Sequence, residues 1–156
     1  MLLRIEEFKL RTRIFFIFVS VLLSASSSAD LKPLKSHENQ SGYYHAIRCS
    51  SVFAAQAKWA GSEKLGKEIF NGYFDIAEGL FTLGIVMATQ QEKMGTVEQA
   101  SKAANSDLTA ISQMYLDRFR DNYARDGFAW QKDEIVNLDH SYCLELARFA
   151  KEKGFI

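Results

Sequence analysis

The absence of proline after Pro33 is the feature that most constrains the fold of this chain. Proline is poorly tolerated inside an α-helix, so residues 34–156 carry no residue that would break one in this way. Apolar residues recur there at spacings of three and four, whereas the strict alternation that marks a half-buried strand is lacking. The sequence therefore predicts an all-α domain.

The apolar spacing predicts four main helices. Their expected ranges are 41–60, 62–89, 106–125 and 138–153. The expected N-terminal residues are Ser41, Ser62, Ser106 and Asn137, and the expected C-terminal stops include Gly61, Gly127 and Gly154. Short connections favour antiparallel neighbours, so we expect an antiparallel bundle of about four helices. Residues 80–88 are almost entirely apolar, which predicts that the second helix is the central one.

The first 29 residues have the composition of a secretory signal peptide. A leader with four basic residues precedes an apolar run at positions 14–23 and then a group of small residues. Ser27 and Ala29 are suited to the positions before a signal-peptidase cut, which would leave Asp30 as the first residue. The run is too short for a membrane-spanning helix, which needs about 20 residues. We expect a periplasmic or secreted protein with no stable membrane insertion after cleavage; a retained anchor is the alternative.

The chain after the predicted cleavage site is weakly acidic. Four of the 19 basic and two of the 19 acidic residues precede Asp30, which leaves 15 basic against 17 acidic residues and a net charge near −2. Such a chain has no general electrostatic attraction for nucleic acid, so we expect no nucleic-acid partner. Residues 30–41 are polar and are expected to form a flexible leader. Residues 42–156 are expected to form the helical domain.

Two cysteines, Cys49 and Cys143, lie in the first and last predicted helices, each one turn from a histidine. His45 and His140 complete a set of residue types that could serve a metal site or a thiol–base pair. An exported protein with two cysteines instead favours a disulfide, because its compartment is oxidising. A bond between residues so far apart would also remove about 4–5 kcal/mol of unfolded-chain entropy. We expect a disulfide that closes the bundle, with no metal or other cofactor; free thiols and a metal site are the alternatives.

The second predicted helix contains four glycines, at positions 66, 72, 79 and 84. Each disfavours the helix by about 1 kcal/mol relative to alanine, which indicates a close approach by another backbone or a ligand. Gly72 and Gly79 are seven residues apart and share a side with Leu83. These three residues are candidate positions for helix packing or interaction. The partner helix belongs to the same chain or to a second copy in a homodimer, and a slot for an apolar ligand is a third interpretation.

The sequence contains no recognised catalytic motif. It lacks a glycine-rich phosphate loop, a serine nucleophile elbow and a His-Glu-x-x-His zinc motif. Asp75 and Glu78 lie one helical turn apart, as a catalytic pair of carboxylates could. The exposed flank of an amphipathic helix explains this pair better. We therefore predict no catalytic residues.

The order of features resembles that of small helical periplasmic proteins that act as immunity partners of secreted bacterial cell-wall amidases. The shared features are the signal peptide, the all-helical pattern, and one cysteine in the first helix and one in the last, here Cys49 and Cys143. The resemblance implies an inhibitor- or immunity-type protein. We accordingly predict an exported helical protein that acts by binding another macromolecule, a protein in the first instance. A small periplasmic hydrolase of unrecognised type and an apolar-ligand binder are the alternatives.

Overall fold

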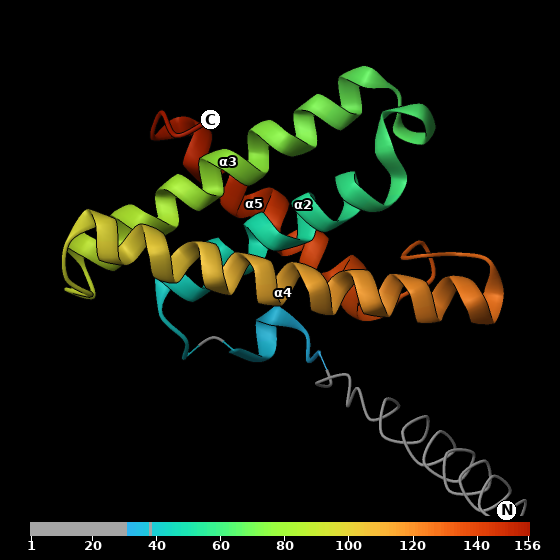
Figure 1. Ribbon diagram of the computed structural model, residues 1–156, viewed down its shortest axis with the longest axis horizontal. Coiled ribbons are helices and arrows are strands. Elements are labelled where there is room, and N and C mark those ends of the chain that lie inside the picture. The colour runs from blue at the N-terminus through green and yellow to red at the C-terminus, as the bar shows by residue number, and fades with distance from the viewer. Residues whose placement is uncertain (1–30, 38) are drawn as a thin grey trace, which may run out of the picture. The chain divides into compact units, whose positions relative to one another are not determined.

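The computed structural model describes residues 31–37 and 39–156, which form four α-helices and a short 3-10 helix (Figure 1). The elements are η1 (Leu34–His37), α2 (Gly42–Leu65), α3 (Lys67–Gln90), α4 (Val97–Asp126) and α5 (Glu134–Glu152). No strand occurs within these described ranges. The predicted all-α bundle of four main helices, with a disulfide between the first and the last, is confirmed. The predicted signal peptide lies outside the described residues.

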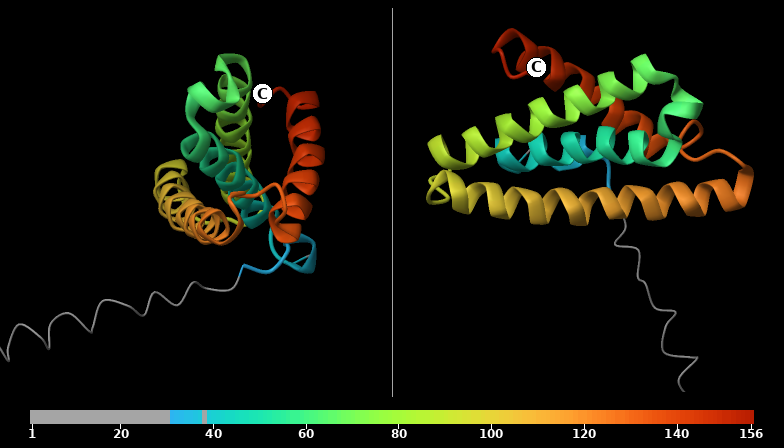
Figure 2. Two further views of the ribbon diagram at one scale, coloured as in Figure 1. Left: turned by 90° about the vertical axis from the view of Figure 1, so that its right-hand side faces the viewer. Right: turned by 45° about the horizontal axis from the view of Figure 1, so that its top comes forward.

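The helices α2 and α3 each contact the three other α-helices, but α2 is the more deeply buried of the two and is the central one (Figures 1 and 2). Most of its residues between positions 43 and 57 are buried. The helix α3 is buried along one face only, so the prediction that the second helix is central was wrong. The physical reason lies in side-chain size. Alanine, serine and cysteine fill much of α2, and these small residues let three helices approach its axis closely.

The hydrophobic core is divided among three faces of α2. One face places Cys49 and Phe53 against α3 and α5. A second face places Val52 against α4 and the first turn of α5. The third face places Ile47 against the end of α3 and the beginning of α4. The helices α3 and α4 therefore pack mainly on α2, whereas α5 packs on both α2 and α3.

Two glycines form the turn between α2 and α3. Gly61 and Gly66 have φ angles of 65° and 78°, a region that residues with side chains rarely adopt. The helix predicted to stop at Gly61 has its break there, followed by one further turn that ends at Leu65. The second helix, predicted from residue 62, therefore begins only at Lys67. The turn sends α3 back over α2 in the opposite direction (Figure 1).

The helix α4 begins nine residues before the predicted Ser106, at Val97. Thr96 and Gln99 form a capping box in which each side chain accepts a hydrogen bond from the other residue's backbone N–H. This cap extends the helix through a segment that is polar and rich in small residues. Gly127, with a φ of 77°, ends α4 as predicted.

The helix α5 begins at Glu134 instead of Leu138. The predicted N-cap, Asn137, lies inside the helix, and Asp133 caps it by accepting a hydrogen bond from Val136 N at 3.2 Å. A cap four residues earlier adds one turn, and that turn brings Val136 into the core.

Residues 31–37, assigned to a flexible leader in the sequence analysis, contribute to the core of the structure. The side chains of Leu31 and Leu34 are 6% and 0% exposed. Leu34 N also donates a hydrogen bond to the carboxylate of Asp139 in α5. The two leucines, together with this hydrogen bond, hold an otherwise polar segment against the helices.

The helix α3 is, among the described residues, the one helix long and apolar enough to cross a membrane by length and composition alone. Helices in the cores of soluble proteins satisfy the same criterion. Its most apolar stretch has a mean hydropathy of 1.2, and only 28% of that stretch is buried. Ile69 and Phe74 are 53% and 46% exposed. A large part of the apolar surface of α3 is therefore uncovered.

Candidate functional site

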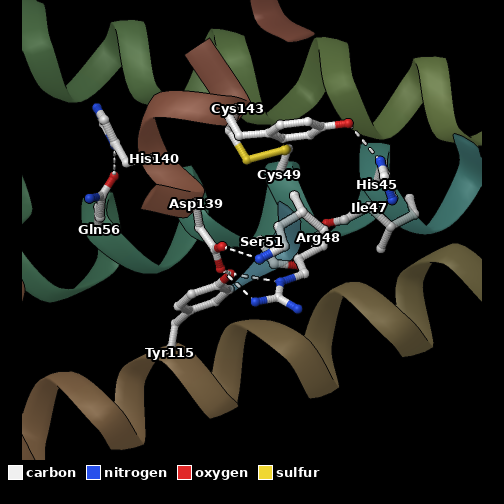
Figure 3. Close-up of a disulfide and its surroundings, with 12 residues drawn as sticks. His45, Ile47, Arg48, Cys49, Ser51, Gln56, Tyr115, Asp139, His140 and Cys143 are labelled. Atoms are coloured by element: carbon white, nitrogen blue, oxygen red, sulfur yellow. Dashed lines mark hydrogen bonds and ion pairs between the residues drawn. A yellow bond between two sulfur atoms is a disulfide. The ribbon is translucent and has the colours of Figure 1, made fainter. Parts of the chain in front are cut away.

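Cys49 of α2 and Cys143 of α5 form a disulfide with an S–S distance of 2.03 Å (Figure 3). The prediction that these two cysteines pair is confirmed. Both residues are completely buried in the cluster that joins α2, α3 and α5. A buried disulfide is compatible with an oxidising compartment outside the cytoplasm.

The two histidines near the disulfide do not form a catalytic or metal-binding group with it. His45 Nδ1 lies 2.6 Å from the hydroxyl of Tyr142, and His140 Nδ1 lies 3.0 Å from the side-chain oxygen of Gln56. Figure 3 shows His45 and His140 on opposite sides of the disulfide. No group of three or more His, Cys, Asp or Glu side chains suited to a metal occurs in the described part of the chain. Because both sulfurs are in the disulfide, neither is available as a thiolate ligand or nucleophile.

A buried ionic cluster lies beside the disulfide and was not anticipated from the sequence. Arg48 of α2 forms an ion pair with Asp139 of α5, with an Nη2–Oδ2 distance of 2.6 Å and side-chain exposures of 2% and 0%. Tyr115 of α4 donates its hydroxyl to the same carboxylate oxygen at 2.5 Å and accepts a hydrogen bond from Arg48 Nε at 3.0 Å. Figure 3 shows the three side chains pointing toward one another. The cluster therefore connects α2, α4 and α5.

The N-terminal segment completes this cluster. Arg48 Nη2 also donates to the backbone carbonyl of Lys32, and Leu34 N donates to Asp139 Oδ1 at 2.5 Å. Arg48 Nη1 donates to the hydroxyl of Tyr44 at 3.1 Å. Removing an ion pair from water is costly unless its remaining donors and acceptors are bonded. Residues 32 and 34 supply part of that bonding.

The chemistry of the cluster is that of a stabilising network. Burial, and after it the charge of Asp139, raises the pKa of Tyr115 well above its ordinary value of 10.0, so the hydroxyl stays protonated as a donor. The side chains of Arg48, Tyr115 and Asp139 are at most 2% exposed, which leaves no room for a substrate to reach them. We therefore assign the cluster to stability and not to catalysis.

The glycines selected from the sequence have different surroundings. A Cβ atom on Gly79 would lie 2.6 Å from the carbonyl oxygen of Phe155 and would overlap the side chain of Ile156, so Gly79 accommodates the C-terminal residues. Leu83 is 3% exposed and belongs to the cluster around the disulfide. Gly72 faces open space, with nothing within 4 Å of an added Cβ. Gly84 is the glycine of α3 at which an added Cβ would meet α2, 2.7 Å from the side chain of Ile47.

Three aromatic side chains gather where the C-terminal end of α4 meets the end of α2, and we call them the aromatic end. They are Trp59, Tyr123 and Trp130. Phe128 lies on the same loop as Trp130. Tyr123 and Phe128 are 54% and 41% exposed, and the two tryptophans are half-buried. Trp59 lies between Tyr123 and the buried Phe119, with ring centroids 6.0 and 6.1 Å away. Beside it is a hollow of about 180 Å³ lined by both tryptophans and Tyr123.

A second polar network holds the loop of the aromatic end in place. Asp133 accepts hydrogen bonds from Arg118 Nε at 2.6 Å and from Asn122 Nδ2 at 2.5 Å. Asn122 Nδ2 also donates to the carbonyl of Ala129 at 3.0 Å. Burial raises the pKa of Asp133, but the bonds from Arg118, Asn122 and Val136 N outweigh it and lower this pKa below its ordinary value. The loop that carries Phe128 and Trp130 is therefore fixed to α4 by a buried carboxylate.

No protein-family model matches the chain, and no curated protein or solved structure is similar enough to it to indicate common descent.

Proposed function

We propose that this protein is exported and acts in the periplasm or outside the cell by binding another protein, as an inhibitor- or immunity-type partner. The observation that carries the proposal is the aromatic end. Tryptophan and tyrosine are the residue types that, with arginine, contribute most to binding energy at protein interfaces. Here they lie partly exposed around a hollow large enough for about one side chain of a partner.

The support beneath the aromatic end favours a binding surface over accidental exposure. Phe119 anchors the rings from below, and Asp133 fixes the loop between α4 and α5. A surface that is rigid before binding loses little conformational entropy when the partner arrives. Lys132 Nζ lies 3.9 Å from the centre of the Phe128 ring, and Arg125 donates to Asn122 at 2.9 Å. These cations form a charged rim that would act on association rate and specificity more than on affinity.

Two features support export. The buried disulfide suits an oxidising compartment, and the first 29 residues have the composition of a signal peptide. Placement outside the cytoplasm also restricts the partner to proteins found there. This agrees with the resemblance of the chain's layout to immunity partners of cell-wall amidases.

Site-specific photo-crosslinking in cells that naturally make the protein tests the proposal. A benzophenone amino acid replaces Tyr123 in one variant and Phe149 in a matched control, because Phe149 is an exposed aromatic residue on α5, 42% exposed. We expect a discrete crosslinked protein from position 123 and none from position 149. The captured protein is then purified, and the variant Tyr123→Ala is expected to bind it at least tenfold more weakly.

Two results would refute protein binding through this surface. One is the same pattern of crosslinks from both positions, or none from either. The other is unchanged affinity of Tyr123→Ala for the captured protein. Turnover of cell-wall fragments by the purified protein alone would favour the hydrolase alternative instead.

A further inference from the structure

A groove separate from the aromatic end lies between the second half of α2, the first half of α3 and the middle of α4. Its volume is about 600 Å³, within the range of small-molecule sites. Figure 2 (left) shows α3 and α4 on two sides of α2. The lining residues that come from α2 form the floor of the groove. Phe70 and Phe74 of α3 form one wall, and Leu108 and Leu116 of α4 form the other.

The groove exists because the residues of its floor are small. On α2 the lining residues include Ala54, Ala57 and Gly61, whose side chains are too short to fill the space between the two walls. The backbone also leaves the helical conformation at Gly61, before α3 begins. Phe70 and Phe74 pack edge to face with centroids 4.9 Å apart, yet Phe74 stays 46% exposed. The groove therefore offers an apolar surface that no part of the described chain covers.

The charge of the lining is of one sign. Lys58 is its single charged residue, and no carboxylate is among the lining residues. No ion pair of Lys58 occurs among the described residues. The uncharged polar residues of the lining are Ser62, Thr109, Ser112 and Gln113. A ligand that matched these features would have a long apolar part and one anionic group at the end beside Lys58.

We propose that the groove binds a single-chain anionic amphiphile of the fatty-acid class. The hydrocarbon chain lies over Ala54, between Phe74 and Leu108, and the carboxylate faces the ammonium of Lys58. Apolar contact supplies most of the affinity, and the single charge selects the anionic head group. The site does not depend on the protein-binding proposal, because none of its lining residues belongs to the aromatic end.

Isothermal titration calorimetry with laurate tests this site, with decanoate and 1-dodecanol as comparison ligands. We expect one laurate per chain. Decanoate has two fewer methylenes and is expected to bind roughly tenfold more weakly. Dodecanol, which lacks the charge, is expected to bind about three- to fivefold more weakly than laurate.

Three variants separate this site from general detergent-like binding. Lys58→Gln should reduce laurate affinity about three- to fivefold and leave dodecanol affinity unchanged, whereas Lys102→Gln, an exposed lysine of α4 outside the groove, should change neither. Thr109→Trp places an indole in the groove from the exposed face of α4 and should abolish binding of both ligands.

Several laurates per chain, equal affinities of the Lys58→Gln variant and the parent protein for laurate, or undiminished binding by a folded Thr109→Trp variant would each overturn the proposal. None of these results bears on crosslinking from position 123, so the fatty-acid proposal and the protein-binding proposal can each fail without the other.

Discussion

The two ends of α2 lie in contrasting environments. Around Arg48 and Cys49, three helices and the N-terminal segment enclose a disulfide and an ion pair. Within the described residues, every buried polar side-chain atom has a hydrogen-bond partner. Around Lys58 and Trp59, a groove and a cluster of aromatic rings face the solvent. The disulfide and the buried ion pair therefore lie at the end around Arg48 and Cys49, which we call the fastened end, whereas the end around Lys58 and Trp59, which we call the open end, exposes apolar surface.

The largest effect on the free energy of unfolding is expected when the disulfide at the fastened end is removed. The double variant Cys49→Ala/Cys143→Ala lacks a crosslink between residues 94 apart and should lose about 4–5 kcal/mol in the free energy of unfolding. Guanidinium unfolding followed by circular dichroism measures this. A loss below about 1 kcal/mol would show that the noncovalent contacts alone hold α5 on α2.

The next effect concerns the buried ion pair. Asp139→Ala leaves the charge of Arg48 buried without its partner and should destabilise the protein by about 3–5 kcal/mol in the same measurement. The control is Asp121→Ala, which removes an exposed carboxylate from α4 and should change stability by less than about 0.5 kcal/mol. Equal effects of the two substitutions would contradict the special role of Asp139.

The N-terminal segment provides the third test. Leu34→Ala removes a fully buried side chain and should cost about 2–3 kcal/mol, which a freely moving leader would not show. Lys32→Ala is the control, because its contribution to Arg48 is a backbone carbonyl that the substitution keeps. Wild-type stability of Leu34→Ala would mean that residues 31–37 are not part of the folded domain.

A smaller effect concerns pH. Burial lowers the pKa of His140 below its ordinary value of 6.5, so the folded protein binds this proton less readily than the unfolded chain does. The stability contributed by neutral His140 is therefore present above about pH 6.5 and decreases as the pH falls below it. Unfolding at several pH values between 5 and 8 should show this slope in the parent protein and a flatter one in His140→Gln. An identical slope in both would exclude His140 as its source.

The smallest effect on stability should come from the open end. Tyr123→Ala removes a side chain that is 54% exposed and should change the free energy of unfolding by less than about 0.5 kcal/mol. The same variant is expected to lose partner binding. A loss of several kcal/mol in stability would instead mean that the aromatic end supports the fold.

Local patterns in the sequence were sufficient for the helical class, for Ser41 as the cap of α2 and for Gly127 as the end of α4. The Cys49–Cys143 pair could also be predicted, because two cysteines allow only one intramolecular pairing. The Arg48–Asp139 pair could not. These residues are 91 positions apart, and helical periodicity does not say which polar edges meet.

Two further features depend on contacts between distant parts of the chain and were not predicted for that reason. Residues 31–37 are polar on average, so composition conceals that Leu31 and Leu34 are buried. The gathering of aromatic side chains at the aromatic end was not predicted either. Its assembly depends on Trp59 and Tyr123, which come from helices whose relative placement no local pattern specifies.

Hydrogen–deuterium exchange of the disulfide-bonded protein tests the contrast between the two ends of α2 most directly. Exchange protection reports the local free energy of opening. We predict the slowest exchange in residues 46–57 of α2 and 139–150 of α5, and clearly faster exchange in residues 61–72 and 123–131. Uniform protection across these segments, or slower exchange at the open end than at the fastened end, would contradict the account.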